Sequence, residues 1–217
     1  MLILDLFSKS EPQWQRTKSY FGKPWIGCQL HGFGRNMGLY GQIMNVTLSL
    51  IDALESPDSL VGFRLTMEGQ EENEIIYDLL LVQAWSAEPI EIKAYFENGV
   101  SGRYAGNHSV PRELYTAWDM MRTTAYHNTN LTTRAVAKPI FELSPDIKGL
   151  LYRAGNHGTT MNYDDSILIK VWSLFMDERK KELILWMNPA YQYDMLDITR
   201  QLLGNAFTAA YSDLMQS

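Results

Sequence analysis

The chain has 217 residues, of which 46% are hydrophobic and 20% are charged. These values are typical of a folded globular protein, and the six tryptophans argue further against an intrinsically disordered chain. The single cysteine, Cys28, excludes an internal disulfide, and the net charge of −6 argues against broad contact with nucleic-acid phosphates.

A chain of this length fits one domain, and no low-complexity linker divides it, so we expect a single globular domain over residues 1–217. The apolar start, Leu2–Phe7, is short and contains an acid, unlike a signal peptide. The longest apolar runs are too short to span a bilayer. These features predict a cytoplasmic protein without a membrane partner.

The first 90 residues contain three segments with a clear pattern. Trp25–Leu30 is a short apolar run that predicts a strand, and a glycine-rich stretch follows it. Gln42–Leu54 has apolar residues at helical spacing and predicts an amphipathic helix. Leu60–Met67 alternates and predicts a strand. Glu74–Ser86 is too continuously apolar for its period to decide between strand and helix.

Two hairpins are predicted further along the chain. Within Ile90–Ala105, apolar and polar residues alternate up to Asn98-Gly99, a pair that favours the type I′ turn of a hairpin. Ile167–Met176 and Leu183–Met187 are predicted to form the second hairpin, joined by a charged turn.

Helices are predicted at Pro111–Thr123, with Ser109 as the N-cap, and at Met195–Leu214, as one helix or two. Pro139–Leu143 and Gly149–Arg153 are short strand candidates. Hairpins and helices without a regular strand–helix–strand alternation predict an α+β fold. We expect an antiparallel sheet built from hairpins, in a single layer that several packed helices cover on one side.

The acidic residues are concentrated in one part of the chain. Between Asp52 and Glu97 there are eleven acids, opposed only by Arg64 and Lys93, while the remainder carries a small basic excess. Clustered carboxylates attract a basic partner and accelerate its association. The acids that we predict to bind such a partner are Glu68, Glu71, Glu72, Glu74, Asp78 and Glu91.

Two of the four histidines, His108 and His157, lie in Gly-Asn-His triplets. The triplet also occurs in metallophosphoesterases, but the other motifs of that family are missing, so the chain is not assigned to it. The alternative is a pair of turn residues. No two histidines have the short spacing of a metal site, so we expect neither a metal nor another cofactor.

Three further groups could carry chemistry. Asp165, beside Asp164, could supply a carboxylate for acid–base work, or mark the exposed start of a strand. Cys28 and His31 are a weak nucleophile–base pair, because the local pattern is a strand and not a helix. The glycines from Gly32 to Gly38 could cradle a phosphate, but their spacing is one residue too long for a dinucleotide fingerprint.

The sequence leaves open whether the protein is an enzyme. The first hypothesis is a non-enzymatic interaction module with an acidic face, either a toxin-neutralising partner or a subunit of a larger assembly. The alternative is a hydrolase or transferase that acts on a phosphorylated or nucleotide ligand, using His108 or His157 with a carboxylate such as Asp165. A nucleic-acid partner is the weakest of the three hypotheses, and the oligomeric state stays open.

Overall fold

A computed structural model describes most of the chain. The described residues are 1–6, 8, 12–31, 38–55, 59–66, 73–106, 109–128, 140–144, 146, 149–150, 159, 163–181 and 183–216. The strands are β1 (Ile3–Asp5), β2 (Trp25–Gln29) and β3 (Leu60–Leu65). The α-helices are α1 (Gln13–Arg16), α2 (Lys18–Phe21), α3 (Ile43–Glu55), α4 (Glu74–Gln83), α5 (Ile92–Tyr104), α6 (Arg112–Thr123), α7 (Asp165–Lys181) and α8 (Pro189–Gln216). Two short 3₁₀ helices are η1 (Ile140–Glu142) and η2 (Leu183–Met187).

The three strands form a parallel sheet in the order β1-β2-β3. Ile3 pairs with Trp25, and Gly27 pairs with Phe63, so all three strands run in the same direction. Parallel neighbours need a crossover connection, and here α1 and α2 join β1 to β2, while α3 joins β2 to β3. The predicted antiparallel sheet of hairpins is therefore wrong within the described part of the chain.

The first hairpin prediction fails because Ile90–Ala105 contains two periods at once. Ile92, Phe96, Val100 and Tyr104 are four residues apart, which places them on one face of a helix. The last three are buried in α5, and the Glu91 carboxylate accepts the backbone N–H groups at the helix start. The capped helix therefore replaces the hairpin, and Asn98-Gly99 becomes an exposed part of its surface.

The second hairpin is also a helix. Leu168, Val171 and Phe175 are fully buried at helical spacing, and α7 continues through the charged residues that were predicted as a turn. Leu183–Met187 is the 3₁₀ helix η2 and not a returning strand. Where Pro139–Leu143 was predicted as a strand, the structure has the 3₁₀ helix η1, and most of the second candidate, Gly149–Arg153, lies outside the described residues.

Several predictions are confirmed. The strands at Trp25 and Leu60 and the helix that begins near Gln42 are present as β2, β3 and α3. The helix predicted at Pro111–Thr123 is α6, although Pro111 and not Ser109 is its N-cap. The segment that was ambiguous is the helix α4, and the C-terminal segment is one continuous helix, α8.

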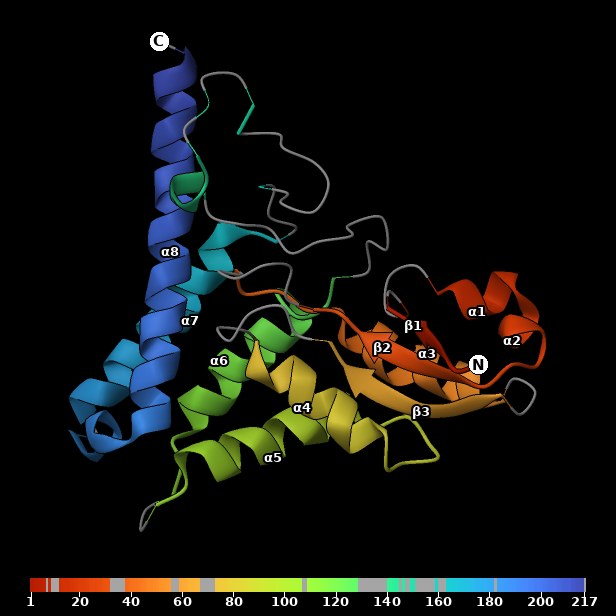
Figure 1. Ribbon diagram of the computed structural model, residues 1–217. Coiled ribbons are helices and arrows are strands. Elements are labelled where there is room, and N and C mark those ends of the chain that lie inside the picture. The colour runs from red at the N-terminus through yellow and green to blue at the C-terminus, as the bar shows by residue number, and fades with distance from the viewer. Residues whose placement is uncertain are drawn as a thin grey trace.

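One hydrophobic core joins the strand-bearing half of the chain to the helical half. Ile43 and Leu79 from α3 and α4 belong to the same cluster of buried residues as Trp118, Phe175 and Tyr191 from α6, α7 and α8. Figure 1 shows the sheet at one side of the molecule, α7 and α8 at the other, and α4, α5 and α6 between them. The two halves are therefore packed against each other, with α4 at their junction.

The helical conformation at Asn98-Gly99 can be tested by replacing Gly99 with alanine. A Cβ at Gly99 would meet no atom within 4 Å, and alanine is the better helix former. We expect Gly99→Ala to raise the free energy of unfolding by about 0.5–1 kcal/mol in urea titrations. A type I′ hairpin turn would give the opposite sign, because its second central residue needs a positive φ.

Candidate functional site

The carboxyl-terminal edge of the sheet is the natural place for a site. Because β2 and β3 are parallel, the chain leaves both strands at the same edge, after Gln29 and after Leu65. Ligands of parallel sheets bind at this edge in open α/β folds and in barrels. Residues 32–37 and 67–72, which begin two or three positions after these strand ends, lie outside the described part of the chain.

The buried side chain of Asn73 connects the flanks of these two segments. Its Nδ2 donates to the Gly38 carbonyl at 3.2 Å and lies 3.4 Å from His31 Nε2, while its Oδ1 accepts the Tyr40 N–H at 3.2 Å. The His31 ring is fully buried between the rings of Tyr40 and Tyr77, at centroid distances of 5.9 and 5.5 Å. The Asn73 side chain thus contacts residues on both sides of the segment 32–37, His31 before it and Gly38 and Tyr40 after it.

The helical half reaches the same edge through α8. Gln201 accepts the Leu39 N–H at 2.8 Å and donates to Asn205 at 2.7 Å, and Asn205 donates to Asp165 at 2.7 Å. This chain of hydrogen bonds places Asp165 at the start of α7, where it accepts from Asn205 and anchors α8. Its proposed part in catalysis stays a prediction.

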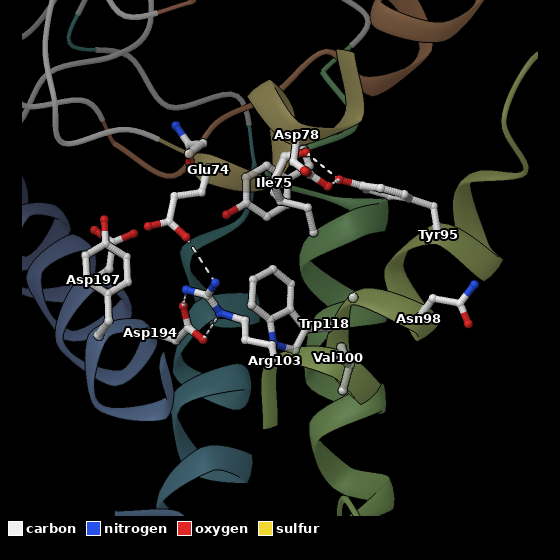
Figure 2. Close-up of a pocket in the computed structure, with 14 residues that line it drawn as sticks. Glu74, Ile75, Asp78, Tyr95, Asn98, Val100, Arg103, Trp118, Asp194 and Asp197 are labelled. Carbon is white, nitrogen blue, oxygen red and sulfur yellow. Dashed lines mark hydrogen bonds and ion pairs between the residues drawn. The ribbon is translucent and has the colours of Figure 1, made fainter. Parts of the chain in front are cut away.

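Beside this edge, a cavity of about 540 Å³ lies between α4, α5, α6 and α8. Figure 2 shows Glu74 and Asp78 of α4, Arg103 of α5, and Asp194 of α8 around it. We call this space the interhelical cavity. Its lining consists of Asn73, Glu74, Ile75, Asp78, Tyr95, Asn98, Gly99, Val100, Arg103, Trp118, Tyr126, Tyr193, Asp194 and Asp197.

Arg103 is the centre of the polar contacts in the cavity. Its Nε and Nη2 donate to the two carboxylate oxygens of Asp194, both at 2.6 Å, and its Nη1 donates to Glu74 at 3.0 Å. Burial favours the neutral form, but the two carboxylates outweigh it and raise the pKa of Arg103. The guanidinium therefore stays charged and holds α4, α5 and α8 together.

Asp194 is almost completely buried and makes a third contact. The Tyr104 hydroxyl donates to its Oδ2 at 2.6 Å, and in turn accepts the Trp118 indole N–H at 2.7 Å. Burial raises the pKa of Asp194, while Arg103 and Tyr104 oppose the shift. Burial and the negative charge of Asp194 raise the pKa of Tyr104, so its hydroxyl stays a donor.

The acids that were predicted to bind a partner do not share one role. Glu74 and Asp78 line the interhelical cavity, whereas Glu91 caps α5. The other three, Glu68, Glu71 and Glu72, lie outside the described residues, as do the two candidate catalytic histidines, His108 and His157.

Cys28 and His31 are not brought together as a reactive pair. Cys28 is buried in β2, and burial raises the pKa of its thiol, which favours the unreactive form. His31 instead packs against Tyr40 and Tyr77 at the strand end. The histidine is therefore part of the packing at this edge.

Sequence reasoning missed Arg103 and Asp194, which are 91 residues apart in the chain. No local motif marks such a pair. In the described ranges, no three His, Cys, Asp or Glu side chains form a group that could hold a metal ion. Nor is any helix of those ranges long and apolar enough to cross a membrane.

Two family models match the chain. Residues 1–87 match the model of the alpha-N-acetylglucosaminidase tim-barrel domain, and residues 95–217 match that of its C-terminal domain. Residues 88–94, which neither model matches, lie between α4 and the first turn of α5, and both helices line the interhelical cavity. The prediction of a single domain over the whole chain stays a prediction.

Individual relatives agree with the family models. The human alpha-N-acetylglucosaminidase is 28% identical over 215 residues, which is 98% of this chain and 27% of the human protein. A family 89 glycoside hydrolase from Clostridium perfringens in complex with PUGNAc is 28% identical, with a TM-score of 0.86 over 97% of this chain and 23% of that chain. A second structure of a family 89 glycoside hydrolase from Clostridium perfringens, in complex with 2-acetamido-1,2-dideoxynojirmycin, is also 28% identical. Its TM-score is 0.87, and the match again covers 97% of this chain and 23% of that chain. The chain thus spans about a quarter of the length of these relatives.

These matches overturn the functional prediction made from charge. The prediction of a non-enzymatic interaction module or assembly subunit with an acidic face is wrong, because both models describe domains of a glycoside hydrolase. The alternative of a phosphorylated or nucleotide ligand finds no support in them either. The C-terminal match alone spans more than half of the chain, and the chain therefore belongs to the alpha-N-acetylglucosaminidase family.

Proposed function

We propose that this chain provides part of the active site of a glycoside hydrolase that removes terminal, α-linked N-acetylglucosamine. The relatives support this substrate class by name. The human relative is an alpha-N-acetylglucosaminidase, and a clostridial relative with two glutamates replaced by glutamine is described in complex with its substrate, GlcNAc-alpha-1,4-galactose.

The observation that carries the proposal is the built edge at the carboxyl ends of β2 and β3. In tim-barrel enzymes the catalytic groups lie at this end of the strands, on the loops that follow them. Here the buried side chains of Asn73 and Gln201 bond to Gly38 and Leu39, which follow the first of those loops, and Asn73 itself follows the second. This end of the sheet is therefore organised from two sides, by α4 and by α8.

Glycoside hydrolysis needs a pair of carboxyl groups, one on each side of the bond that breaks. In the sequence, Glu68 is the first acid after β3, three residues beyond Leu65. After β2 no acid occurs before Asp52. The last residue of β1, Asp5, is buried, and one of its carboxylate oxygens accepts the Gln13 N–H at the start of α1. Glu68 is thus the carboxylate that we propose for catalysis.

The second carboxylate and the rest of the barrel need further strands. A closed barrel of this type has eight strands, and the described part of the chain supplies three. The outer edges of β1 and β3 would then pair with the strands that complete it. The proposed activity therefore belongs to the barrel in which these two edges are paired.

The proposal is tested by hydrolysis and by inhibitor binding. We expect the protein with the completed barrel to release N-acetylglucosamine from an α-linked nitrophenyl glycoside, and 2-acetamido-1,2-dideoxynojirmycin to inhibit that release. The β-linked nitrophenyl glycoside is the matched control and should remain intact. If the completed protein leaves the α-linked glycoside intact, the proposed function is wrong.

A further inference from the structure

The interhelical cavity has a charge and a lining that the proposed hydrolysis of a neutral sugar does not require. We propose that it binds an organic ammonium ion about as large as a monosaccharide. The site would be separate from the catalytic carboxylate proposed at Glu68, and it does not depend on the proposed activity.

Charge is the first argument. Four carboxylates line the cavity, those of Glu74, Asp78, Asp194 and Asp197. Arg103 pairs with both Glu74 and Asp194. Arg200 pairs with Asp197 at 2.6 Å. Two negative charges are left uncompensated by these pairs, which attracts a cation. Figure 2 shows Asp78 facing the neutral hydroxyl of Tyr95, which donates to it at 2.7 Å.

Aromatic side chains form much of the remaining lining. They are Tyr95, Trp118, Tyr126 and Tyr193, and the rings of Trp118 and Tyr126 are stacked with 6.5 Å between their centroids. Aromatic faces attract cations, and the Arg103 guanidinium already lies 5.9 Å from the centroid of the Tyr193 ring. Carboxylates together with aromatic faces are the groups that recognise an organic ammonium ion.

The hydroxyl of Tyr126 is an independent observation that points to a ligand. Tyr126 lines the cavity and is only 3% exposed, yet its hydroxyl has no hydrogen-bond partner among the described residues. Burial, followed by the charges of Asp197 and Asp194, raises its pKa, so the hydroxyl is neutral and lies near these two acids. A hydroxyl oxygen in this position can accept an ammonium N–H of a ligand in the cavity.

The size of the cavity fits a small molecule better than a bare metal ion. The cavity volume of about 540 Å³ falls in the range of small-molecule sites, roughly 300–1,000 Å³. A molecule with one ring and an ammonium group can contact the aromatic lining and a carboxylate at the same time. A single inorganic cation would leave most of this space to water.

The test uses two probes that differ mainly in charge. Glucosamine carries an ammonium group below neutral pH, and N-acetylglucosamine has the same ring with a neutral amide. We expect isothermal titration of the chain to show binding of glucosamine, and glucosamine to stay bound when N-acetylglucosamine is in excess. Absence of glucosamine binding would overturn the cavity proposal but leave the proposed hydrolysis untouched, since that is measured with the acetylated sugar.

Two variants locate the binding. Tyr126→Phe removes only the hydroxyl without a partner, so the fold should keep its stability while glucosamine binds about tenfold more weakly. Asp78→Asn can still accept from Tyr95 but removes an exposed charge, and we expect affinity to fall by about three- to fivefold.

Asp52→Asn is the matched control, because it removes an exposed charge from α3, away from the residues that line the cavity. It should leave glucosamine binding unchanged. Equal losses in Asp52→Asn and Asp78→Asn would show unspecific attraction and would refute the site. Affinity that neither Tyr126→Phe nor Asp78→Asn lowers would refute it as well.

Discussion

Replacement of Asp194 by asparagine is expected to lower the free energy of unfolding by about 3 kcal/mol, because it leaves the Arg103 guanidinium without its main partner. The Arg103 side chain is three-quarters buried, with 25% of it exposed. An asparagine would direct one N–H₂ group at an Arg103 N–H, so that at least one of the two 2.6 Å hydrogen bonds is lost. The estimate lies at the lower end of the usual range because Glu74 still pairs with Arg103.

Equilibrium unfolding in urea measures this effect, with the midpoint and the slope fitted separately. Asp119→Asn is the matched control, since Asp119 pairs with Arg122 within one helix turn and is 49% exposed. Such a pair contributes at most about 1 kcal/mol. If both variants lose the same small amount of stability, the ion pair of Arg103 and Asp194 does not hold α5 and α8 together.

A double-mutant cycle separates the ion pair from the loss of packing. Arg103→Met alone leaves the Asp194 carboxylate buried with only the Tyr104 hydroxyl as a donor, and should be about as destabilising as Asp194→Asn. Arg103→Met together with Asp194→Asn removes both charges, so we expect the double variant to be less destabilising than the sum of the two single changes. The coupling energy of the pair is the loss of stability in the double variant minus the summed losses of the two single variants.

Much of the parallel sheet could be predicted one element at a time, but its direction could not. The apolar run of β2 and the helical spacing of α3 are local signals, and both elements are where the sequence predicts them. The direction of pairing is set by the crossovers, which depend on contacts between distant segments. Once Ile90–Ala105 and Ile167–Met187 were interpreted as hairpins, an antiparallel sheet followed from them.

The errors in the helical half have a common physical cause. Residues at i and i+4 lie on the same face of a strand as well as of a helix, so Ile92, Phe96 and Val100 fit both. This segment forms a helix and not a strand because Glu91 caps its start and because its apolar face is buried against α6 and α8. Neither can be seen from the period alone.

Part of the glycine-rich stretch is explained by packing. A Cβ at Gly41 would lie 2.5 Å from Ile76 Cδ1, so only glycine lets this segment approach α4 so closely. The sequence indicates an irregular glycine segment but not what it packs against. In the same way, Arg103 and Asp194 are unremarkable charges until α5 and α8 bring them together. Sites built from distant residues leave no short motif.

The largest expected effect on activity is that of Glu68→Gln. If Glu68 is one of the two catalytic carboxylates, the amide can neither transfer a proton nor attack the sugar, and kcat should fall by about 10³-fold. The position of Glu68, three residues beyond the end of β3, motivates this expectation, since catalytic groups of barrels follow the strands. The measurement is release of nitrophenol from the α-linked N-acetylglucosaminide by the protein with the completed barrel.

Glu71→Gln makes the same chemical change three residues later, and therefore serves as the matched control. It should keep kcat within about tenfold of the unchanged protein, because only one carboxylate of this segment can occupy the position beside the bond that breaks. Both variants should retain the unfolding midpoint, which separates a catalytic loss from a loss of folding. An active Glu68→Gln protein, or an inactive Glu71→Gln protein that is folded, would move the catalytic assignment to another acid.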